Sequence, residues 1–458
     1  GGLNISYDDG AHWFKGNSHG VSQFYAVNVD EQEPYNIYGG MQDNGVWVGP
    51  SNYKFSSEWY QTGKYPYENL IGGDGMQIQI DKRNPNIVFT GFQFGNYYRI
   101  DRANNKRDYI SPVQKKGEKP FRYNWQTPIL LSSHNQEILY MGSNFLHRSM
   151  NQGQTWTAIS PDLTQGAKEG NVAFGTIAAI SESPLQFGLL YTGSDDGLVH
   201  VSKDGGATWN IISGNLPQNR WISRVVASAH KKERVYVTLN GYRNDDFTTY
   251  VYMSDDFGQT WINIATNLPT SPVNVLVEDN VNEDVLYLGT DNGLYVSLNK
   301  GSLWNDFSNG IPNVAVHDLV IQKKAKDLVV GTHGRSIYKV NLEPVQQLNE
   351  KVLAENLHVF EIKKIKKSKE WGNNWSSWAK AAEPKAEIWF YSDSDAEVVI
   401  QVENSLKEVV FSQKIKAVKG LNNLAYDLSI AKSKADNWKK KDKKLKLEES
   451  KNGKYYLP

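Results

Sequence analysis

The chain has 458 residues, of which 39% are apolar and 12% aromatic, and this is enough apolar side chain for more than one buried core. Its 50 basic and 50 acidic residues cancel, so no overall field favours nucleic acid or an anionic membrane as a partner. The absence of cysteine excludes disulfides and thiol chemistry. No apolar run approaches the ~18 residues that a membrane-spanning helix needs.

The chain opens with the first copy of a short motif, which reads Ser, a spacer, Asp or Asn, a spacer, Gly, two spacers and Trp. Its clearest copy is Ser202 to Trp209, and further copies begin at Ser6, Ser149, Ser254 and Ser297. The Ser hydroxyl and the Asp or Asn oxygen can accept turn amides, and Gly takes a backbone angle that side chains disfavour. Trp buries a large apolar area between neighbouring sheets. We call this the repeat motif and predict a strand, a tight turn and a second strand at each copy.

A second signature lies upstream of the motifs, a strand of aliphatic and aromatic residues that ends in Gly. These glycines are Gly40, Gly91, Gly142, Gly193, Gly289 and Gly331, and the first four are 51 residues apart. A period near 50 with short alternating strands is typical of a β-propeller with one four-stranded blade per repeat. The sequence therefore predicts an all-β, seven- or eight-bladed β-propeller over residues 1–344, with a stacked β-sandwich as the alternative.

Within one repeat, strand A is an inner run such as Ile177–Ile180, strand B ends in Gly, strand C precedes the motif and strand D starts at its Trp. Residues 1–16 supply only C and D, so we expect the first blade to take its inner half from upstream sequence or from the other end of the chain. Degraded copies of the motif stand at Ser56–Trp59 and Asp101–Asn104.

The pattern changes after Pro344. Residues 345–385 show no clear period and are predicted to be a linker. Alternation returns from Ala386, and residues 386–458 are predicted to form a small, truncated Ig-like β-sandwich that lacks its last strand. The basic run Trp438–Lys444 is predicted to be a solvated loop.

The repeat motif resembles the Asp-box, or BNR repeat, of sialidase-like and sortilin-like propellers. With Gly39–Gly45, Gly72–Gly75 and Phe121–Pro128, the chain resembles a family of large bacterial Asp-box proteins described as sortilin-like or xyloglucanase-like glycosyl hydrolases. The likeness covers residues 1–340, and the Ig-like segment fits the C-terminal part of that family. The resemblance implies a propeller in a secreted or outer cell-surface bacterial protein.

In such a propeller, the starts of the A strands and the B to C turns share one face, opposite the repeat motifs. On that face, Asp43 and Asp74 are candidates for the two carboxylates of a glycoside hydrolase, which lie about 5 to 9.5 Å apart. The glycines on both sides of Asp74 let a ligand approach the backbone. The alternative is structural: Asp43-Asn44-Gly45 also reads as an ordinary hairpin turn, and Asp74 can cap turn amides.

The same face offers candidates for ligand binding. Two tryptophans can stack on sugar rings or hold a peptide, with packing between blades as their alternative, while polar groups orient the ligand. The candidate ligand-binding residues are Gln42, Gln93, Arg122, Trp125, Asp195, Trp221, Arg224, His333 and Arg335. The nine histidines show no metal-ligand spacing, so we predict no metal and no cofactor.

The sequence thus favours a ligand- or protein-binding module that takes a glycan or an extended peptide at the propeller mouth. Envelope proteins are further candidate partners, whereas nucleic acid is not expected. Two alternatives remain, a glycoside hydrolase that acts on a polysaccharide and a structural subunit of an envelope assembly. Because the chain opens inside a repeat, we expect any targeting segment to precede Gly1.

Overall fold

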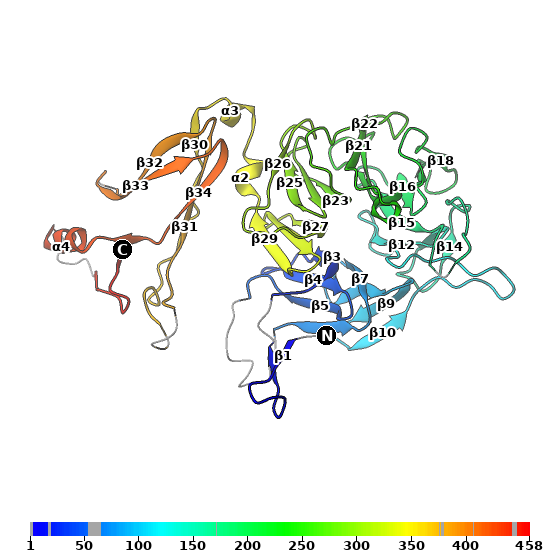
Figure 1. Ribbon diagram of the computed structural model, residues 1–458, viewed down its shortest axis with the longest axis horizontal. Helices are drawn as coiled ribbons and strands as arrows, with labels where there is room; N and C mark the ends of the chain where they lie inside the picture. The colour runs from blue at the N-terminus through cyan, green and yellow to red at the C-terminus, as the bar shows by residue number, and fades with distance from the viewer. Residues whose placement is uncertain are drawn as a thin grey trace. The chain divides into compact units, whose positions relative to one another are not determined.

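Figure 1 shows the computed structural model of the chain, which describes residues 3–16, 20–53, 66–170, 172–374, 376, 380–405, 407–441 and 447–458. The chain divides into two compact units, Gly1–Asn341 and Leu342–Pro458. Antiparallel sheets make up most of the regular structure, which confirms the all-β class.

The first unit contains seven successive sheets within the described residues, six with four strands and one with three. The first three sheets are β3 (Phe24–Val29), β4 (Asn36–Met41), β5 (Gly45–Pro50) and β6 (Glu68–Ile71); β7 (Gly75–Ile80), β8 (Ile87–Phe92), β9 (Asn96–Asp101) and β10 (Lys106–Tyr109); and β11 (Ile129–Leu131), β12 (Leu139–Gly142), β13 (Leu146–Ser149) and β14 (Thr157–Ala158). The next three are β15 (Ile177–Glu182), β16 (Leu190–Ser194), β17 (Val199–Ser202) and β18 (Asn210–Ile211); β19 (Trp221–Ala227), β20 (Val235–Asn240), β21 (Tyr250–Ser254) and β22 (Ile262–Asn263); and β23 (Val273–Glu278), β24 (Leu286–Thr290), β25 (Gly293–Ser297) and β26 (Trp304–Asp306). The three-stranded sheet is β27 (Val316–Gln322), β28 (Asp327–Thr332) and β29 (Ile337–Asn341).

These sheets follow one another around a ring (Figure 1). The first strand of each sheet is innermost and contacts the first strand of the next sheet, from β3 through β7, β11, β15, β19 and β23 to β27. The ring closes because β27 also contacts β3, and because Gln23 forms an isolated bridge with His333. This radial arrangement is that of a β-propeller.

The glycine that ends the second strand has a steric cause. A Cβ on Gly142 would lie 2.9 Å from Ile177, and a Cβ on Gly193 would lie 2.3 Å from Ile222. Both isoleucines belong to the inner strand of the following sheet, β15 or β19. The absence of a side chain therefore lets neighbouring sheets approach closely near the axis.

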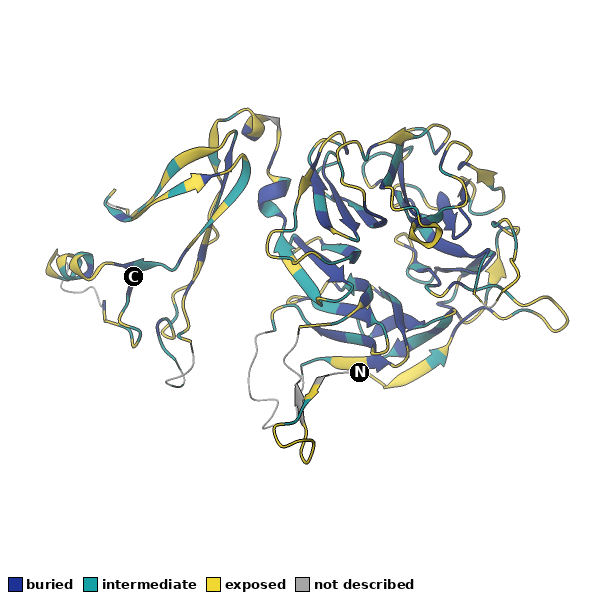
Figure 2. Ribbon diagram, viewed as in Figure 1, coloured by how far each residue is buried: buried dark blue, intermediate teal, exposed yellow. Residues whose placement is uncertain are grey.

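The second strands of the six four-stranded sheets also carry a buried aromatic residue, and the core follows the inner strands around the ring (Figure 2). The hydroxyl of Tyr140 donates to Glu182 Oε1 at 3.1 Å, and that of Tyr236 donates to Glu278 Oε1 at 3.0 Å. Each glutamate ends the inner strand of the next sheet. A buried hydroxyl needs such a partner, so these bonds also tie adjacent sheets together.

The repeat motif forms the predicted turn. In the copy at Ser202, the hydroxyl donates to Asp204 Oδ1 and accepts the Gly206 amide, both at 2.8 Å. Trp209 Nε1 then donates to the carbonyl of Ile159, which follows the outer strand of the preceding sheet, at 2.9 Å. The motif thus combines a local turn with an anchor on the neighbouring sheet, as the placement of Trp predicts.

The N-terminal copy lies in a separate two-stranded sheet of β1 (Leu3–Ile5) and β2 (Phe14–Gly16). The degraded copy at Asp101–Asn104 makes the turn between β9 and β10, where Asp101 Oδ1 accepts the Asn104 amide at 3.2 Å. The degraded copy at Ser56–Trp59 lies outside the described residues.

The second unit has three small sheets within its described residues, β30–β31–β34, β32–β33 and β35–β36. Its elements are α2 (Glu343–Gln346), α3 (Glu350–Leu353), β30 (Leu357–Val359), β31 (Ala386–Ser392), β32 (Ala396–Glu403), β33 (Val409–Ala417), β34 (Gly420–Tyr426), β35 (Ser429–Ile430), α4 (Lys432–Lys441) and β36 (Tyr455–Tyr456). Phe411 of β33 stacks on Tyr426 of β34 with ring centroids 4.2 Å apart, so the first two sheets share a core.

Two segments of this unit differ from the sequence-based prediction. Inside the predicted linker, β30 pairs with β31, because a three-residue strand is too short for alternation to reveal. The start of the basic run predicted to be a loop belongs to helix α4, which ends at Lys441, and residues 442–446 lie outside the described residues.

Candidate functional site

The two residues predicted to supply a catalytic pair of carboxylates, Asp43 and Asp74, are joined through a backbone amide at the start of β7. The backbone amide of Asp43 donates to Asp74 Oδ1 at 2.8 Å, and the amide of Asp74 donates to Gln93 Oε1 at 3.1 Å. Asp43 is exposed in a left-handed turn conformation (φ 59°), whereas Asp74 is 8% exposed. Asp74 therefore caps the turn between β4 and β5 and links the first sheet to the second.

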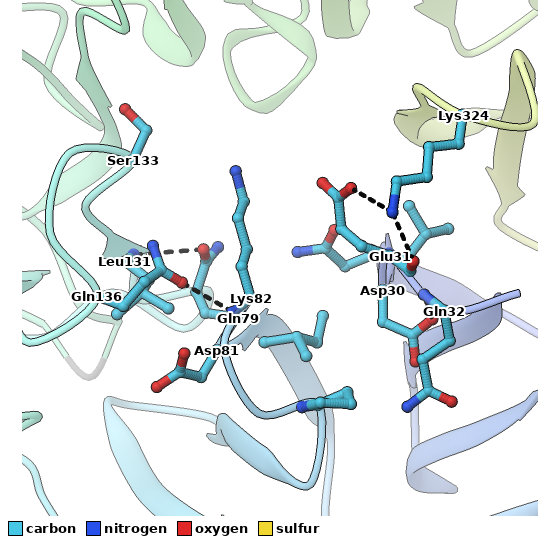
Figure 3. A pocket seen from close by; sticks show the side chains of 14 residues that line it. Asp30, Glu31, Gln32, Gln79, Asp81, Lys82, Leu131, Ser133, Gln136 and Lys324 are labelled. Carbon is cyan, nitrogen blue, oxygen red and sulfur yellow. Dashed lines mark hydrogen bonds and ion pairs between the residues drawn. The ribbon is translucent and has the colours of Figure 1, made fainter.

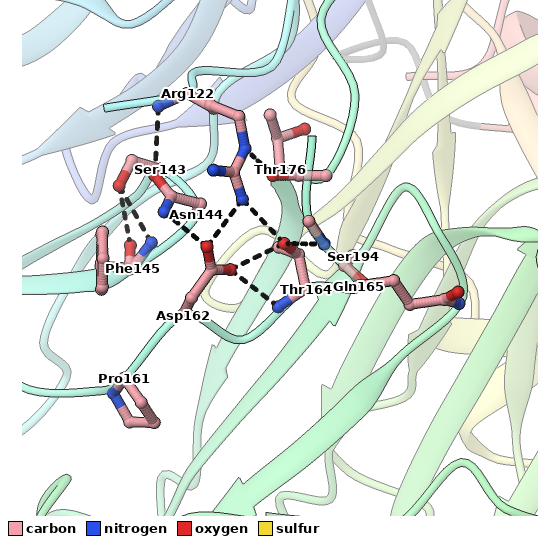
Figure 4. Close-up of polar contacts among 12 residues, drawn as sticks. Arg122, Ser143, Asn144, Phe145, Pro161, Asp162, Thr164, Gln165, Thr176 and Ser194 are labelled. Carbon is pink, nitrogen blue, oxygen red and sulfur yellow. Dashed lines mark hydrogen bonds and ion pairs between the residues drawn. The ribbon is translucent and has the colours of Figure 1, made fainter. Parts of the chain in front are cut away.

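Arg122 lies at the centre of a polar network between the third and fourth sheets (Figure 4). Its guanidinium donates to Asp162 Oδ2 at 2.7 Å, to Thr164 Oγ1 at 2.9 Å and to the carbonyl of Gly175 at 3.0 Å. Asn144 Nδ2 reaches the same carboxylate oxygen of Asp162 at 2.9 Å. These contacts hold three loops together, so Arg122 has a structural role on this face.

Asp195 is buried in a second network beside the first. Its carboxylate accepts the Thr176 amide at 2.9 Å and the Thr176 hydroxyl at 2.6 Å, and Asn124 Nδ2 lies 3.4 Å away. Burial raises the pKa of Asp195, while the bonds from Thr176 oppose this shift. Asp195 is 5% exposed, and its carboxylate is bound to other groups of the protein.

Arg224 of β19 spans the axis of the ring. Its Nη2 donates to Asp318 Oδ1 of β27 at 2.7 Å, and Asp318 Oδ2 accepts the amide of Val27 in β3 at 2.9 Å. The pair lines a cavity of about 170 Å³ that the inner strands enclose. This ion pair thus connects three sheets across the channel.

Aromatic side chains surround the channel at the same face. Trp125 is 39% exposed and meets Phe94 edge to face, with centroids 5.0 Å apart. The guanidinium of Arg243 lies over the rings of Trp221 and Tyr242, at 4.1 Å and 4.5 Å from their centroids. Such stacking orients a cation against aromatic faces and leaves its edge open to a ligand.

His333 is part of the seam where the last sheet meets the first. Its ring stacks on His317 with centroids 4.3 Å apart, and Tyr25 of β3 lies 5.6 Å away on another side. Burial lowers the pKa of His317 to about 3 and lowers that of His333 as well. Both imidazoles are therefore neutral at pH 7.

Three predicted residues share a groove of about 1020 Å³ between β29 and the first sheet. Gln42, Asp43 and Arg335 line it together with Trp47 and other aromatic residues. Arg335 is exposed, and among the described residues it has no carboxylate partner. The groove accordingly has an aromatic wall and a cation that can meet a ligand.

A further cavity of about 360 Å³ lies at the opposite ends of the inner strands (Figure 3). Its carboxylates are engaged locally: Asp30 Oδ1 accepts the Asn36 amide at 2.8 Å, and Asp81 pairs with Arg83 at 2.8 Å. Lys324 pairs with Glu31 at 3.8 Å. These contacts shape the turns after β3 and β7.

Two features are absent from the described part of the chain, a metal-binding cluster and a membrane-spanning helix. No cluster of three or more His, Asp or Glu side chains suits a metal ion there. In the same part of the chain, no helix combines the length and apolarity that crossing a membrane requires.

Sequence reasoning alone did not select several residues of this face. Tyr242 lies beside Arg243 in the insertion between β20 and β21, and Tyr53 and Tyr67 line the groove just after β5 and just before β6. Only the length of the insertion signalled Tyr242. Tyr53 and Tyr67 gave no signal, because their position depends on packing between distant strands.

Comparison with known proteins supports the fold. The family model of the DUF6242 beta propeller domain matches residues 126–338. The GH74 xyloglucanase from Xanthomonas campestris is 15% identical, with 70% of this chain and 52% of the enzyme covered at a TM-score of 0.53. The GH74 enzyme from Niastella koreensis is 16% identical, with 81% and 58% covered at a TM-score of 0.50. Among curated proteins nothing matches.

The chain therefore spans little more than half the length of these enzymes. A structure of YCF48 bound to D1 peptide is 10% identical, with 69% of this chain and 92% of that chain covered at a TM-score of 0.49. For the two enzymes, at 15% and 16% identity, the likeness is one of architecture.

Proposed function

We propose that the first unit is a seven-bladed propeller that binds an extended ligand, a glycan or a peptide, on the face that carries Gln42, Trp125 and Arg335. The observation that carries this proposal is that some candidate residues on that face are bonded within the protein while others are exposed. Arg122, Asp195 and Arg224 are engaged with other protein groups, whereas Arg335 and Trp125 are exposed. Exposed side chains that no ion pair within the described residues engages are those that a ligand can use.

The groove favours a long ligand over a small one. Its volume of about 1020 Å³ is at the upper end of the range for small-molecule sites. Aromatic rings offer flat apolar surfaces to sugars or side chains, and Arg335 can pair with a carboxylate or donate to a carbonyl oxygen. We propose that such a module acts in a secreted or cell-surface protein.

Binding can be tested by titration calorimetry with xyloglucan oligosaccharides and with a library of unstructured peptides. We expect Arg335→Ala and Trp125→Ala each to weaken binding about tenfold, as is typical of anchor residues. Arg107→Ala, on the exposed strand β10, is the matched control and should bind as the parent does. Unchanged affinity in both site variants, at unchanged melting temperature, would remove the proposal.

The alternative is hydrolysis of a polysaccharide, which rests on the architecture shared with GH74 enzymes and on the proximity of Asp43 and Asp74. On this alternative, Asp43→Asn abolishes release of reducing sugar from xyloglucan while binding persists. Absence of turnover in the parent protein counts against it. Stoichiometric co-purification with envelope proteins would instead favour a structural subunit.

A further inference from the structure

The loop between β20 and β21 is held in one conformation by its own polar contacts. Asp246 Oδ2 accepts Arg220 Nε at 2.7 Å and the hydroxyl of Tyr250 at 2.9 Å. Asn240 Oδ1 accepts the amide of Tyr242 at 3.2 Å, where a short 3₁₀ turn begins. A loop fixed in this way presents its side chains to a ligand with little further loss of conformational entropy.

This loop presents Arg243, whose guanidinium lies 4.1 Å from the ring centroid of Trp221 and 4.5 Å from that of Tyr242. Arg243 is exposed, and among the described residues its guanidinium makes no hydrogen bond or ion pair. The neighbouring carboxylate of Asp195 is bonded to the hydroxyl of Thr176 instead, at 2.6 Å. A guanidinium that stacks on aromatic rings keeps its N–H edge free, and that edge matches a carboxylate.

Arg243 lies close to the axis of the ring. Burial lowers the pKa of His317 to about 3, and the neighbouring His333, Arg224 and Arg243 add to this shift. His317 belongs to β27, the innermost strand of its sheet, and its ring stacks on that of His333. Arg243 therefore stands at the mouth of the channel, beside two imidazoles that are neutral at pH 7.

Tyr25 links this cation to a second group of aromatic rings. Burial raises the pKa of Tyr25, the nearby Asp74, Asp43 and Tyr242 add to the increase, and a hydrogen bond with Trp125 opposes it. Tyr25 is thus close to both Trp125 and Tyr242, which are 39% and 44% exposed. Exposed rings on the two sides of Tyr25 offer flat surfaces to a ligand that is bound at Arg243.

The inner strands are irregular at this mouth. In β3, β19 and β27 the register shifts beside Tyr25, Ser223 and His317. A shift also occurs near the start of β7, β15 and β23. Bulges of this kind turn side chains in a new direction and are frequent beside binding sites.

Deeper in the channel, side chains already occupy backbone amides of the inner strands. Gln77 Oε1 accepts the amide of Ile129 at 3.1 Å, and the Ser181 hydroxyl accepts the amide of Ala227 at 3.0 Å. These amides are therefore not available for pairing with an added peptide strand. Recognition at the mouth depends on side chains, and aromatic rings with a polar group beside them suit the face and the edge of a sugar.

We propose that the channel mouth is a subsite for a uronate residue of an acidic glycan, with its carboxylate at the guanidinium edge of Arg243 and the adjoining sugar units on the rings of Tyr242 and Trp125. The inference rests on the proposed function, since it names the ligand class of the same face. The planar fork of Arg243 matches a carboxylate through two parallel hydrogen bonds. A neutral sugar leaves this cation unused, so the site distinguishes acidic from neutral glycans.

Titration calorimetry of the full chain tests the charge of the ligand directly. The probes are oligomers of galacturonic, glucuronic and mannuronic acid, each paired with its methyl ester, which keeps the sugar and removes the charge. We expect at least one acid to bind about tenfold more tightly than its ester, because only the acid forms the ion pair with Arg243. Added salt should narrow this difference, since it screens partly exposed charges.

Three variants identify the residue that makes the difference. Arg243→Ala should abolish the preference for the acid while the melting temperature stays close to that of the parent, because the side chain is exposed. Arg243→Lys keeps the charge but loses the planar fork, so it should retain part of the preference. Arg107→Ala, on the exposed strand β10, is the matched control and should retain all of it.

Equal affinity for every acid and its ester would overturn this inference. If a neutral sugar or a peptide then binds through Arg335 and Trp125, the proposed function stands without it, whereas binding of no sugar and no peptide removes both. Binding of acidic peptides through Arg243, with no uronate preferred over its ester, would also overturn the assignment to a glycan. An equal loss of affinity for acid and ester in Arg243→Ala would show a structural role and exclude the ion pair.

Discussion

The joints between the sheets of the ring are of two kinds. Between the second and sixth sheets, a tryptophan of one sheet docks on an isoleucine carbonyl of the sheet before it, as Trp261 does on Ile212 at 2.7 Å. At the seam between the last and first sheets, polar bonds join residues about 290 positions apart. Tyr35 donates to Asp327 at 2.8 Å, and Val27 donates to Asp318 at 2.9 Å.

This difference shows how a repeat protein closes. A docked motif works between any two successive copies, because each copy brings both a tryptophan and an acceptor. The seam joins two ends that are not successive copies, so its contacts are unique and partly ionic. Removing a docked tryptophan and removing a polar bond of the seam should therefore lower the free energy of unfolding by different amounts. Only the loss at the seam should depend on pH.

The largest effect is expected at a docked joint. Trp261→Ala removes the indole and leaves a space beside Ile212, which should lower the free energy of unfolding by about 3–5 kcal/mol. Urea unfolding measures this loss. Trp261→Phe, which keeps a ring, should lose less than half as much, and equal losses would contradict the packing argument.

The next effect is expected at the ion pair across the channel, whose Asp318 also belongs to the seam. Asp318→Asn leaves Arg224 without its charged partner in a mostly buried place, at a cost of about 2–3 kcal/mol. The control is Asp284→Asn, whose partner Lys300 lies 3.0 Å away on the surface, where a pair contributes less than about 1 kcal/mol. Similar losses in both variants would show that the channel pair is not special.

The seam should also respond to acid through His317. Burial lowers its pKa to about 3, so between pH 6.5 and 3 the unfolded chain binds a proton that the folded chain does not. Stability therefore falls as the pH drops through this window, by up to about 1.4 kcal/mol per pH unit from this residue. His317→Asn should reduce the slope of unfolding free energy against pH by one proton, and an unchanged slope would exclude a buried neutral imidazole.

The smallest effect is expected at the edge of the seam. Tyr35→Phe removes the hydroxyl that donates to Asp327 and should cost about 1.5 kcal/mol, since the buried carboxylate loses a donor. Tyr7, which is 87% exposed, gives the control Tyr7→Phe with no change. If calorimetry finds no difference between the two variants, Asp327 is satisfied by its other partners.

The periodic features of the ring could be predicted from the sequence because their causes are local. The turn at Ser202 uses atoms within four residues, and the glycine at 193 recurs because the next inner strand passes close to it. The candidate site depended on partners that no local pattern reveals. Arg122 finds Asp162 forty residues away, and Arg224 finds Asp318 ninety-four residues away.

By itself, the sequence determined the period, the order of the strands, the turn of each motif and the side of the ring on which polar residues gather. Only the tertiary structure decided which of those residues pair with one another and which face the groove, because pairing depends on distances across the ring. It also decided that Trp13 is 66% exposed, whereas the indoles of Trp209 and Trp261 donate to the preceding sheet. A motif sets its own turn, but its dock exists only when the neighbouring sheet is in place.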